Sequence, residues 1–126
     1  MITGLAGSTI FTEDSAKLAA FYRDVVGLAV APNTGTDPTS GETFWVFGPP
    51  DSAVVCVGKH SEVRGKNNDP ARHIVGLASN DIDADFARLK AAGVEFIEEP
   101  TPAGQGLRIA TLKDPDGNFI QLLQFA

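Results

Sequence analysis

The stretch Asp114-Pro115-Asp116-Gly117-Asn118 joins two apolar runs, Leu107 to Leu112 and Phe119 to Phe125. Pro115 fixes its own φ at a value suited to a turn, and Gly117 or Asn118 can adopt the left-handed conformation that closes a hairpin. The stretch therefore predicts two antiparallel strands near the end of the chain. The second of them carries Gln121 in its middle.

Upstream of this hairpin, the sequence predicts one helix between two further strands. Asn80 or Asp81 supplies an N-cap, and Gly93 ends the helix. Its apolar positions are Ile82, Phe86 and Leu89. The predicted strands are His73 to Ser79 and Val94 to Ile97, and the residues Glu98 to Gly106 read as a Pro/Gly loop.

The first half of the chain has the same order of elements. A strand is predicted for Ile2 to Thr12, and Asp14 caps a helix that ends at Gly27. Apolar side chains recur in this helix at i, i+3, i+4, i+7 and i+8, namely Leu18, Phe21, Tyr22, Val25 and Val26. The remaining strands are Leu28 to Ala31, Thr43 to Phe47 and Ala53 to Val57, with a Gly- and Pro-rich connection over Pro32 to Glu42.

This internal repeat predicts one domain of 126 residues built from two modules. The first module covers about 1–58, a polar linker covers 59–71, and the second module covers about 72–126. Each module has one helix to cover one face of its sheet. The other face of each sheet is left free to line a concavity.

Composition limits the partners. The net charge of −6 argues against nucleic acid and against an anionic membrane, which require a basic surface. The single Cys56 excludes an internal disulfide. The sequence contains no apolar run long enough to span a membrane and no basic-then-apolar leader, so we expect a cytoplasmic protein.

The early motif Phe21-Tyr22-Arg23-Asp24-Val25-Val26-Gly27-Leu28 and the late Asp-Pro-Asp-Gly-Asn turn together resemble the vicinal oxygen chelate superfamily. That superfamily includes glyoxalase I, extradiol dioxygenases, fosfomycin-resistance enzymes and bleomycin-resistance proteins. The resemblance covers nearly the whole chain. It implies an α+β fold of two βαβββ modules that form an open barrel-like cleft, and a homodimer in which each cleft takes one module from each chain. One such scaffold hosts many chemistries.

In the metal-dependent relatives, His, Gln or Glu side chains on four strands hold one divalent metal. The resemblance places the four positions at Gly7, at Cys56, at Ile74 or His73, and at Gln121. Glycine has no side chain, and a thiol with a neutral amide is a poor ligand set for a hard divalent ion. We therefore expect no metal cofactor. If a divalent metal does bind, its ligands would be His73, Cys56 and Gln121.

A one-residue bulge decides whether Ile74 or His73 occupies the third position, because side chains alternate between the faces of a strand. Val75 and Leu77 fit the helix-packed face. On that register His73 points away from the open face.

Aromatic residues are the strongest candidates for a ligand site, since they commonly line pockets for organic molecules. Trp45 and Phe47 share one face of their strand, and Phe44 and Val46 share the other. One pair can join the core while the other lines the cleft. Arg108, beside the last hairpin, either pairs with an acidic ligand group or is a solvated surface residue. The expected ligand-binding set is Thr9, Phe11, Trp45, Phe47, Cys56, Phe119, Gln121 and Arg108.

Two functions follow from these expectations. The first is a metal-independent protein, similar to the drug-sequestering members of the superfamily, that encloses a small apolar or aromatic molecule between Trp45, Phe47, Phe11 and Phe119. Gln121 would supply a hydrogen bond. The alternative is a metal-dependent lyase, isomerase or dioxygenase with a degenerate metal site. The sequence leaves open whether the protein is an enzyme.

Overall fold

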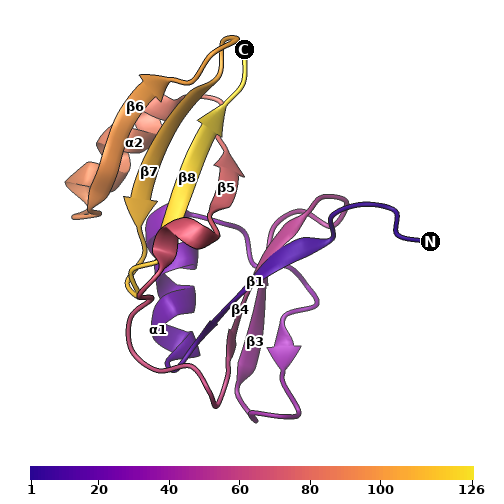
Figure 1. Ribbon diagram of the computed structural model, residues 1–126. Coiled ribbons are helices and arrows are strands. Elements are labelled where there is room, and N and C mark those ends of the chain that lie inside the picture. Colours follow the sequence, from indigo (N-terminus) through magenta and orange to yellow (C-terminus); the bar gives the residue numbers. More distant parts are fainter. The chain divides into compact units, whose positions relative to one another are not determined.

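The computed structural model describes residues 1–126, which divide into two compact units, residues 1–65 and 66–126. Each unit holds one open four-stranded sheet with a helix that packs on it (Figure 1). Both units follow the expected order of strand, helix and three strands. The boundary between the units falls inside the segment 59–71 that the sequence predicts as a linker.

The sheet of the first unit has the strand order β1-β4-β3-β2. Strand β1 runs parallel to β4, and the other neighbours are antiparallel. Its elements are β1 Gly7–Thr12, α1 Ser15–Ala20, the π-helical segment η1 Phe21–Val26, β2 Gly35–Thr36, β3 Thr43–Phe47 and β4 Val54–Lys59.

Helix α1 begins at the predicted cap. The Asp14 carboxylate accepts a hydrogen bond from the Lys17 N–H at 3.1 Å, which satisfies one of the free donors of the first turn. The helix continues into η1, whose last hydrogen bond runs from the Gly27 N–H to the Tyr22 carbonyl. Gly27 then leaves the helix with a positive φ of 90°, a conformation that costs glycine little.

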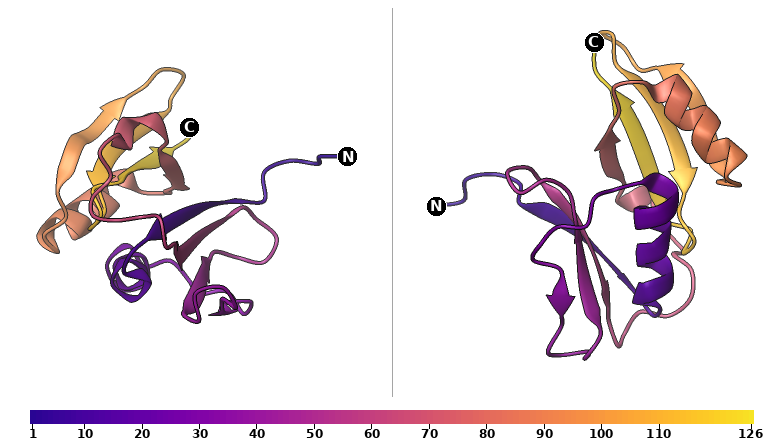
Figure 2. Two further views of the ribbon diagram at one scale, coloured as in Figure 1. Left: turned by 60° about the horizontal axis from the view of Figure 1, so that its bottom comes forward. Right: turned by 180° about the vertical axis from the view of Figure 1, so that it is seen from behind.

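The sheet of the second unit repeats the topology, with the strand order β5-β8-β7-β6. Strand β5 is parallel to β8, and the remaining pairs are antiparallel. Figure 2 shows this sheet from behind, with helix α2 lying along one of its faces. The elements are the 3₁₀ turn η2 Pro70–Arg72, β5 Val75–Ala78, α2 Ile82–Ala91, β6 Phe96–Pro102, β7 Arg108–Lys113 and β8 Phe119–Gln124.

The Asp-Pro-Asp-Gly-Asn turn closes the β7–β8 hairpin as predicted. The Asp114 N–H donates to the Asn118 carbonyl at 3.0 Å, and Gly117 takes the left-handed conformation at φ 78°. The Asp114 side chain is 5% exposed and accepts hydrogen bonds from the N–H groups of Asp116 and Asn118 and from the Asn118 amide. One buried carboxylate therefore organises the whole turn.

Three expected boundaries need correction. Strand β1 starts at Gly7 and not at Ile2, because its neighbour β4 begins at Val54, the partner of Gly7. Strand β5 starts at Val75 because the 3₁₀ turn occupies the residues before His73. The expected strand Leu28 to Ala31 contributes only a single bridge, between Val30 and Phe47.

Strand β6 also runs through much of the expected Pro/Gly loop, as far as Pro102. It is an edge strand that pairs only with β7, and its register shifts on both sides of Glu98. Proline is tolerated on such an edge because its missing N–H removes no hydrogen bond from a second neighbour. The short strand β2, in the connection before β3, was not predicted.

Each helix covers one face of its sheet and leaves the other uncovered within its own unit. The buried residues beneath α1 include Ile10, Val55 and Val57, and those beneath α2 include Ala110, Leu112, Ile120 and Leu122. Side chains alternate along each strand, so their neighbours in sequence lie on the uncovered face. No helix combines the length and the apolar character that crossing a bilayer requires.

Candidate ligand-binding site

The uncovered face of the first sheet is set by the register of its strands. Thr9 lies beside Cys56, and Phe11 lies beside Gly58. On the other side of β4, Val46 lies beside Cys56. The face therefore carries small residues near its middle and aromatic residues toward the end of β1.

Gly58 brings two of these aromatic rings together. A methyl group in place of its hydrogen would lie 2.6 Å from Cδ2 of Phe44 and 3.4 Å from Cε1 of Phe11. The Phe44 contact is closer than carbon atoms allow, so only glycine leaves room for this ring over β4. Because Gly58 has no side chain, the two rings lie directly over the backbone of β4.

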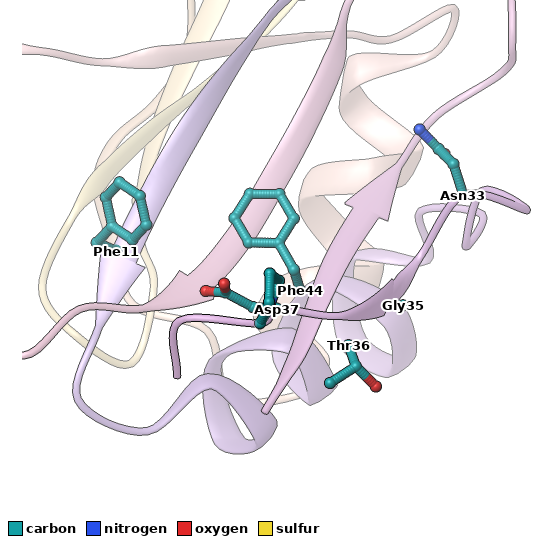
Figure 3. Close-up of a pocket in the computed structure, with 7 residues that line it drawn as sticks. Phe11, Asn33, Gly35, Thr36, Asp37 and Phe44 are labelled. Carbon is teal, nitrogen blue, oxygen red and sulfur yellow. The ribbon is translucent and has the colours of Figure 1, made fainter. Parts of the chain in front are cut away.

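A cavity of about 420 Å³ opens beside these rings (Figure 3). Its walls come from β1, from β3 and from the segment 33–38, which includes the edge strand β2. A cavity of this size suits a small organic molecule. Its lining residues are Phe11, Asn33, Gly35, Thr36, Asp37, Pro38 and Phe44.

The far wall of the cavity is a turn held by Asp37. Its carboxylate accepts hydrogen bonds from the Thr39 N–H at 2.9 Å and from the Ser40 hydroxyl at 3.2 Å. The Asp37 N–H donates to the Glu42 carbonyl at 2.8 Å. These bonds fix the backbone of the wall before any ligand arrives.

Glu42 anchors this turn to the rest of the unit. Its carboxylate lies 3.0 Å from Nζ of Lys59 on β4 and accepts a hydrogen bond from the buried Ser15 hydroxyl of α1 at 2.9 Å. The hydrogen bond with Lys59, followed by that with Ser15, lowers the pKa of the Glu42 carboxyl from its ordinary value. The wall is therefore attached at one end to both the helix and the central strand.

His60 extends the aromatic surface, a contribution that the sequence did not indicate. Its ring lies edge-on to Phe11, with 5.1 Å between the ring centroids. Its Nδ1 atom accepts a hydrogen bond from the Glu62 N–H at 3.1 Å. When the imidazole is neutral, its proton is therefore on Nε2, which keeps a free donor. The two-residue alternation after Cys56 and Gly58 could have pointed to His60.

Trp45 and Phe47 lie on the opposite, helix-covered face, and the expectation that they line the cleft is corrected. Trp45 pairs with Val57 and Phe47 with Val55, both of which are buried core residues. Phe47 is 1% exposed, and its ring lies 6.4 Å from that of the buried Tyr22. Register across the β3–β4 hairpin decides which face is buried.

Trp45 lies on the outer side of the aromatic pair Phe47 and Tyr22. It stacks on Phe47 at a centroid distance of 6.2 Å, and the Arg23 guanidinium lies 5.4 Å from its ring centroid. Arg23 in turn forms two hydrogen bonds with Asp24, at 2.7 and 2.8 Å. Trp45 therefore belongs to the packing between the sheet and η1.

On the second sheet, Phe119 and Gln121 lie on the uncovered face, as predicted from the alternation of β8. Gln121 pairs with Gly76 on β5 and with Thr111 on β7. Its amide Nε2 donates to the Thr111 hydroxyl at 3.4 Å. The Oε1 atom of the amide takes no part in this hydrogen bond. That Gln121 contacts a ligand stays a prediction.

Arg108 lies on the helix-covered side of the second sheet, beside Gln124. Its guanidinium donates two hydrogen bonds to the Asp83 carboxylate of α2, at 2.7 and 3.0 Å. The hydrogen bond with Arg108 lowers the pKa of Asp83. Arg108 is therefore neither a free surface cation nor a contact for a molecule on the uncovered face.

The residues at the superfamily's metal positions do not suit a divalent metal. Burial raises the pKa of the Cys56 thiol, and a hydrogen bond with Thr9 only partly offsets this, so the metal-binding thiolate is disfavoured. Gln121 offers a neutral amide, and the exposed His73 lies in the bend before β5, outside the strand. No three His, Cys, Asp or Glu side chains cluster in a metal-binding arrangement.

Two βαβββ modules, each with an open sheet covered on one side by a helix, define the class of protein. Residues 4–122 match the Glyoxalase/Bleomycin resistance protein/Dioxygenase superfamily, and the chain belongs to that family. The fold expected from the sequence is thereby confirmed.

Three relatives illustrate the match. The protein YetH of Bacillus subtilis (strain 168) is 25% identical over 122 residues, which cover 97% of this chain and 98% of YetH. TnmS3, an antibiotic binding protein from Streptomyces sp. CB03234, is 25% identical, with a TM-score of 0.75 and coverage of 99% of this chain and 98% of TnmS3. A superfamily member from Sphaerobacter thermophilus DSM 20745 is 26% identical, with a TM-score of 0.75 and 98% of both chains covered.

Proposed function

We propose that this protein binds a small apolar or aromatic molecule without a metal, and that the ligand lies in the cavity beside Phe11 and Phe44. The observation that carries the proposal is the placement of both rings over Gly58, at the edge of a cavity of about 420 Å³. A glycine at this point in a strand leaves ring surface available to a ligand.

The construction of the cavity supports binding in preference to turnover. Its walls supply aromatic carbon, a proline and a turn whose backbone is already fixed by hydrogen bonds. Binding requires complementarity to the ground state of the ligand and needs neither a nucleophile nor a metal. Cys56, on the same face of the sheet, is disfavoured as a nucleophile by its raised pKa. The 25% identity with the antibiotic binding protein TnmS3 also favours a binding function.

Replacing Phe44 tests this site. Isothermal titration of the wild type with naphthalene-sized aromatic compounds should give one-to-one binding, and Phe44→Ala should weaken it by roughly tenfold or more. The reason is that a buried aromatic contact contributes about 1.5–3 kcal/mol. The matched control is Phe125→Ala, which removes a 67% exposed ring outside the cavity and should leave the affinity unchanged.

Two results would contradict the proposed site. One is equal affinity in the wild type and in Phe44→Ala. The other is a complete lack of binding across a panel of one-, two- and three-ring compounds.

Metal independence has its own measurement. Addition of Ni, Zn, Mn or Fe should leave the midpoint of thermal unfolding unchanged, because a ligand specific to the folded state must raise its stability. Elemental analysis should find no stoichiometric metal in the purified protein. Tight one-to-one metal binding that is lost in Gln121→Ala would favour the alternative of a metal-dependent lyase, isomerase or dioxygenase.

A further inference from the structure

We infer that this cavity selects organic cations, that is, molecules with a protonated amine or a similar group next to an apolar body, and that Asp37 determines this selectivity. The inference rests on the proposed function, since it concerns the same cavity. It goes further by assigning the charge of the ligand and the residue that reads it.

Asp37 is the one ionisable side chain among the lining residues. It is half-buried. In the view of Figure 3 its carboxylate lies below the gap between the rings of Phe11 and Phe44 and extends toward the side on which Phe11 lies. A ligand that covers the two rings would therefore place its polar end near this carboxylate.

The charge of Asp37 has no cationic partner in the protein. Its two hydrogen-bond donors, the Thr39 N–H and the Ser40 hydroxyl, are both neutral and belong to its own turn. Lys59 of β4 is paired with Glu42. A carboxylate has about four acceptor positions, so two remain for a ligand, and an ammonium group can fill them with charge-assisted hydrogen bonds.

The aromatic walls, like the Asp37 carboxylate, favour a positively charged ligand. A cation near the face of a phenyl ring is attracted by the negative charge distribution of that face. An anionic ligand would meet both the ring faces and the Asp37 carboxylate, and each repels it. The cavity is therefore unfavourable to carboxylates and phosphates of similar shape.

Three naphthalene probes of nearly equal shape test the inference: 1-naphthylmethylamine, 1-naphthalenemethanol and 1-naphthoate. Titration calorimetry of the wild type should show the amine binding at least about tenfold tighter than the alcohol, with the naphthoate weakest. Asp37→Asn should remove the advantage of the amine over the alcohol. The amide oxygen of asparagine can still accept the Thr39 N–H, so the turn is kept while its charge is lost.

Asp51→Asn is the matched control. It removes the same charge from an exposed turn outside the cavity and should leave the amine's advantage intact. If the amine keeps its advantage in Asp37→Asn, the inference is overturned, because Asp37 then serves only to hold its turn. If the advantage disappears equally in Asp51→Asn, the inference is also overturned, because the selectivity then comes from the overall charge of the protein.

Salt dependence keeps the test decisive if Asp37→Asn fails to fold. Raising the salt concentration from 0.02 to 0.5 M shortens the Debye length from roughly 20 Å to below about 5 Å. In the wild type, this change should weaken the binding of the amine and leave the binding of the alcohol unaffected. If the alcohol binds in a Phe44-dependent way and the amine binds no better, the inference fails while the proposed function stands. If no probe binds, the proposed function itself is wrong.

Discussion

At the scale of single residues, two positions carry more of the structure than their size indicates. Gly58 admits the Phe44 and Phe11 rings to the surface of the first sheet, and Asp114 organises the last hairpin of the second unit. The two act in opposite ways. Gly58 matters for the atoms it lacks, whereas Asp114 matters for the donors it satisfies.

We expect Asp114→Ala to destabilise the protein by about 2–4 kcal/mol, because it leaves the N–H groups of Asp116 and Asn118 without their acceptor in a partly buried turn. Chemical denaturation followed by circular dichroism measures this loss. Asp116→Ala is the control, since no hydrogen bond to that side chain holds the turn together, and it should cost much less. An equal loss of stability in both variants would mean that the turn depends on its negative charge and not on the hydrogen bonds that Asp114 accepts.

At the scale of elements, strand β3 divides its aromatic residues between two tasks. Phe44 faces the cavity, while Trp45 and Phe47 pack against the helical segment η1 through Tyr22. The sequence predicts this division by strand alternation. It does not predict which pair faces the cavity, because that depends on the pairing of β3 with β4.

Trp45→Ala should therefore affect stability and not binding. We expect a loss of about 2 kcal/mol from the half-buried ring that stacks on Phe47, below the 3–5 kcal/mol typical of fully buried aromatic residues. Titration of this variant with the naphthalene probes should give the wild-type affinity. A tenfold weaker affinity in a folded Trp45→Ala protein would return Trp45 to the ligand site.

Helix ends and turns are the elements that the sequence predicts best. The caps at Asp14 and Asp81 and the left-handed Gly27, Gly93 and Gly117 all lie where they are expected, because each depends on residues within four positions along the chain. Strand limits are less local. Strand β1 starts where its partner β4 starts, and β6 continues past its prolines because it is an edge.

At the scale of the whole molecule, the main feature of the fold is that one module is repeated. Both sheets place a parallel pair beside an antiparallel hairpin, and both leave one face uncovered within their unit. The resemblance noted in the sequence implies that the protein pairs with a second copy. We propose a homodimer on that basis.

Sedimentation equilibrium tests the homodimer. The expected mass is twice the 13.2 kDa of one chain. The affinity for the naphthalene probes, measured above and below the concentration of half-dissociation, then shows whether binding depends on assembly. A mass of one chain at high micromolar concentration would exclude a stable dimer.

The sequence by itself determined the two modules, the helix caps and the hairpin around Asp114. All of these follow from residue identity and from neighbours along the chain. Only the tertiary structure decided that Phe44 replaces Trp45 beside the cavity, that Arg108 is paired with Asp83, and that Asp37 lines a cavity wall. These placements depend on the register between strands and on a connection that joins the edge of the first sheet through β2, and neither is encoded by local spacing.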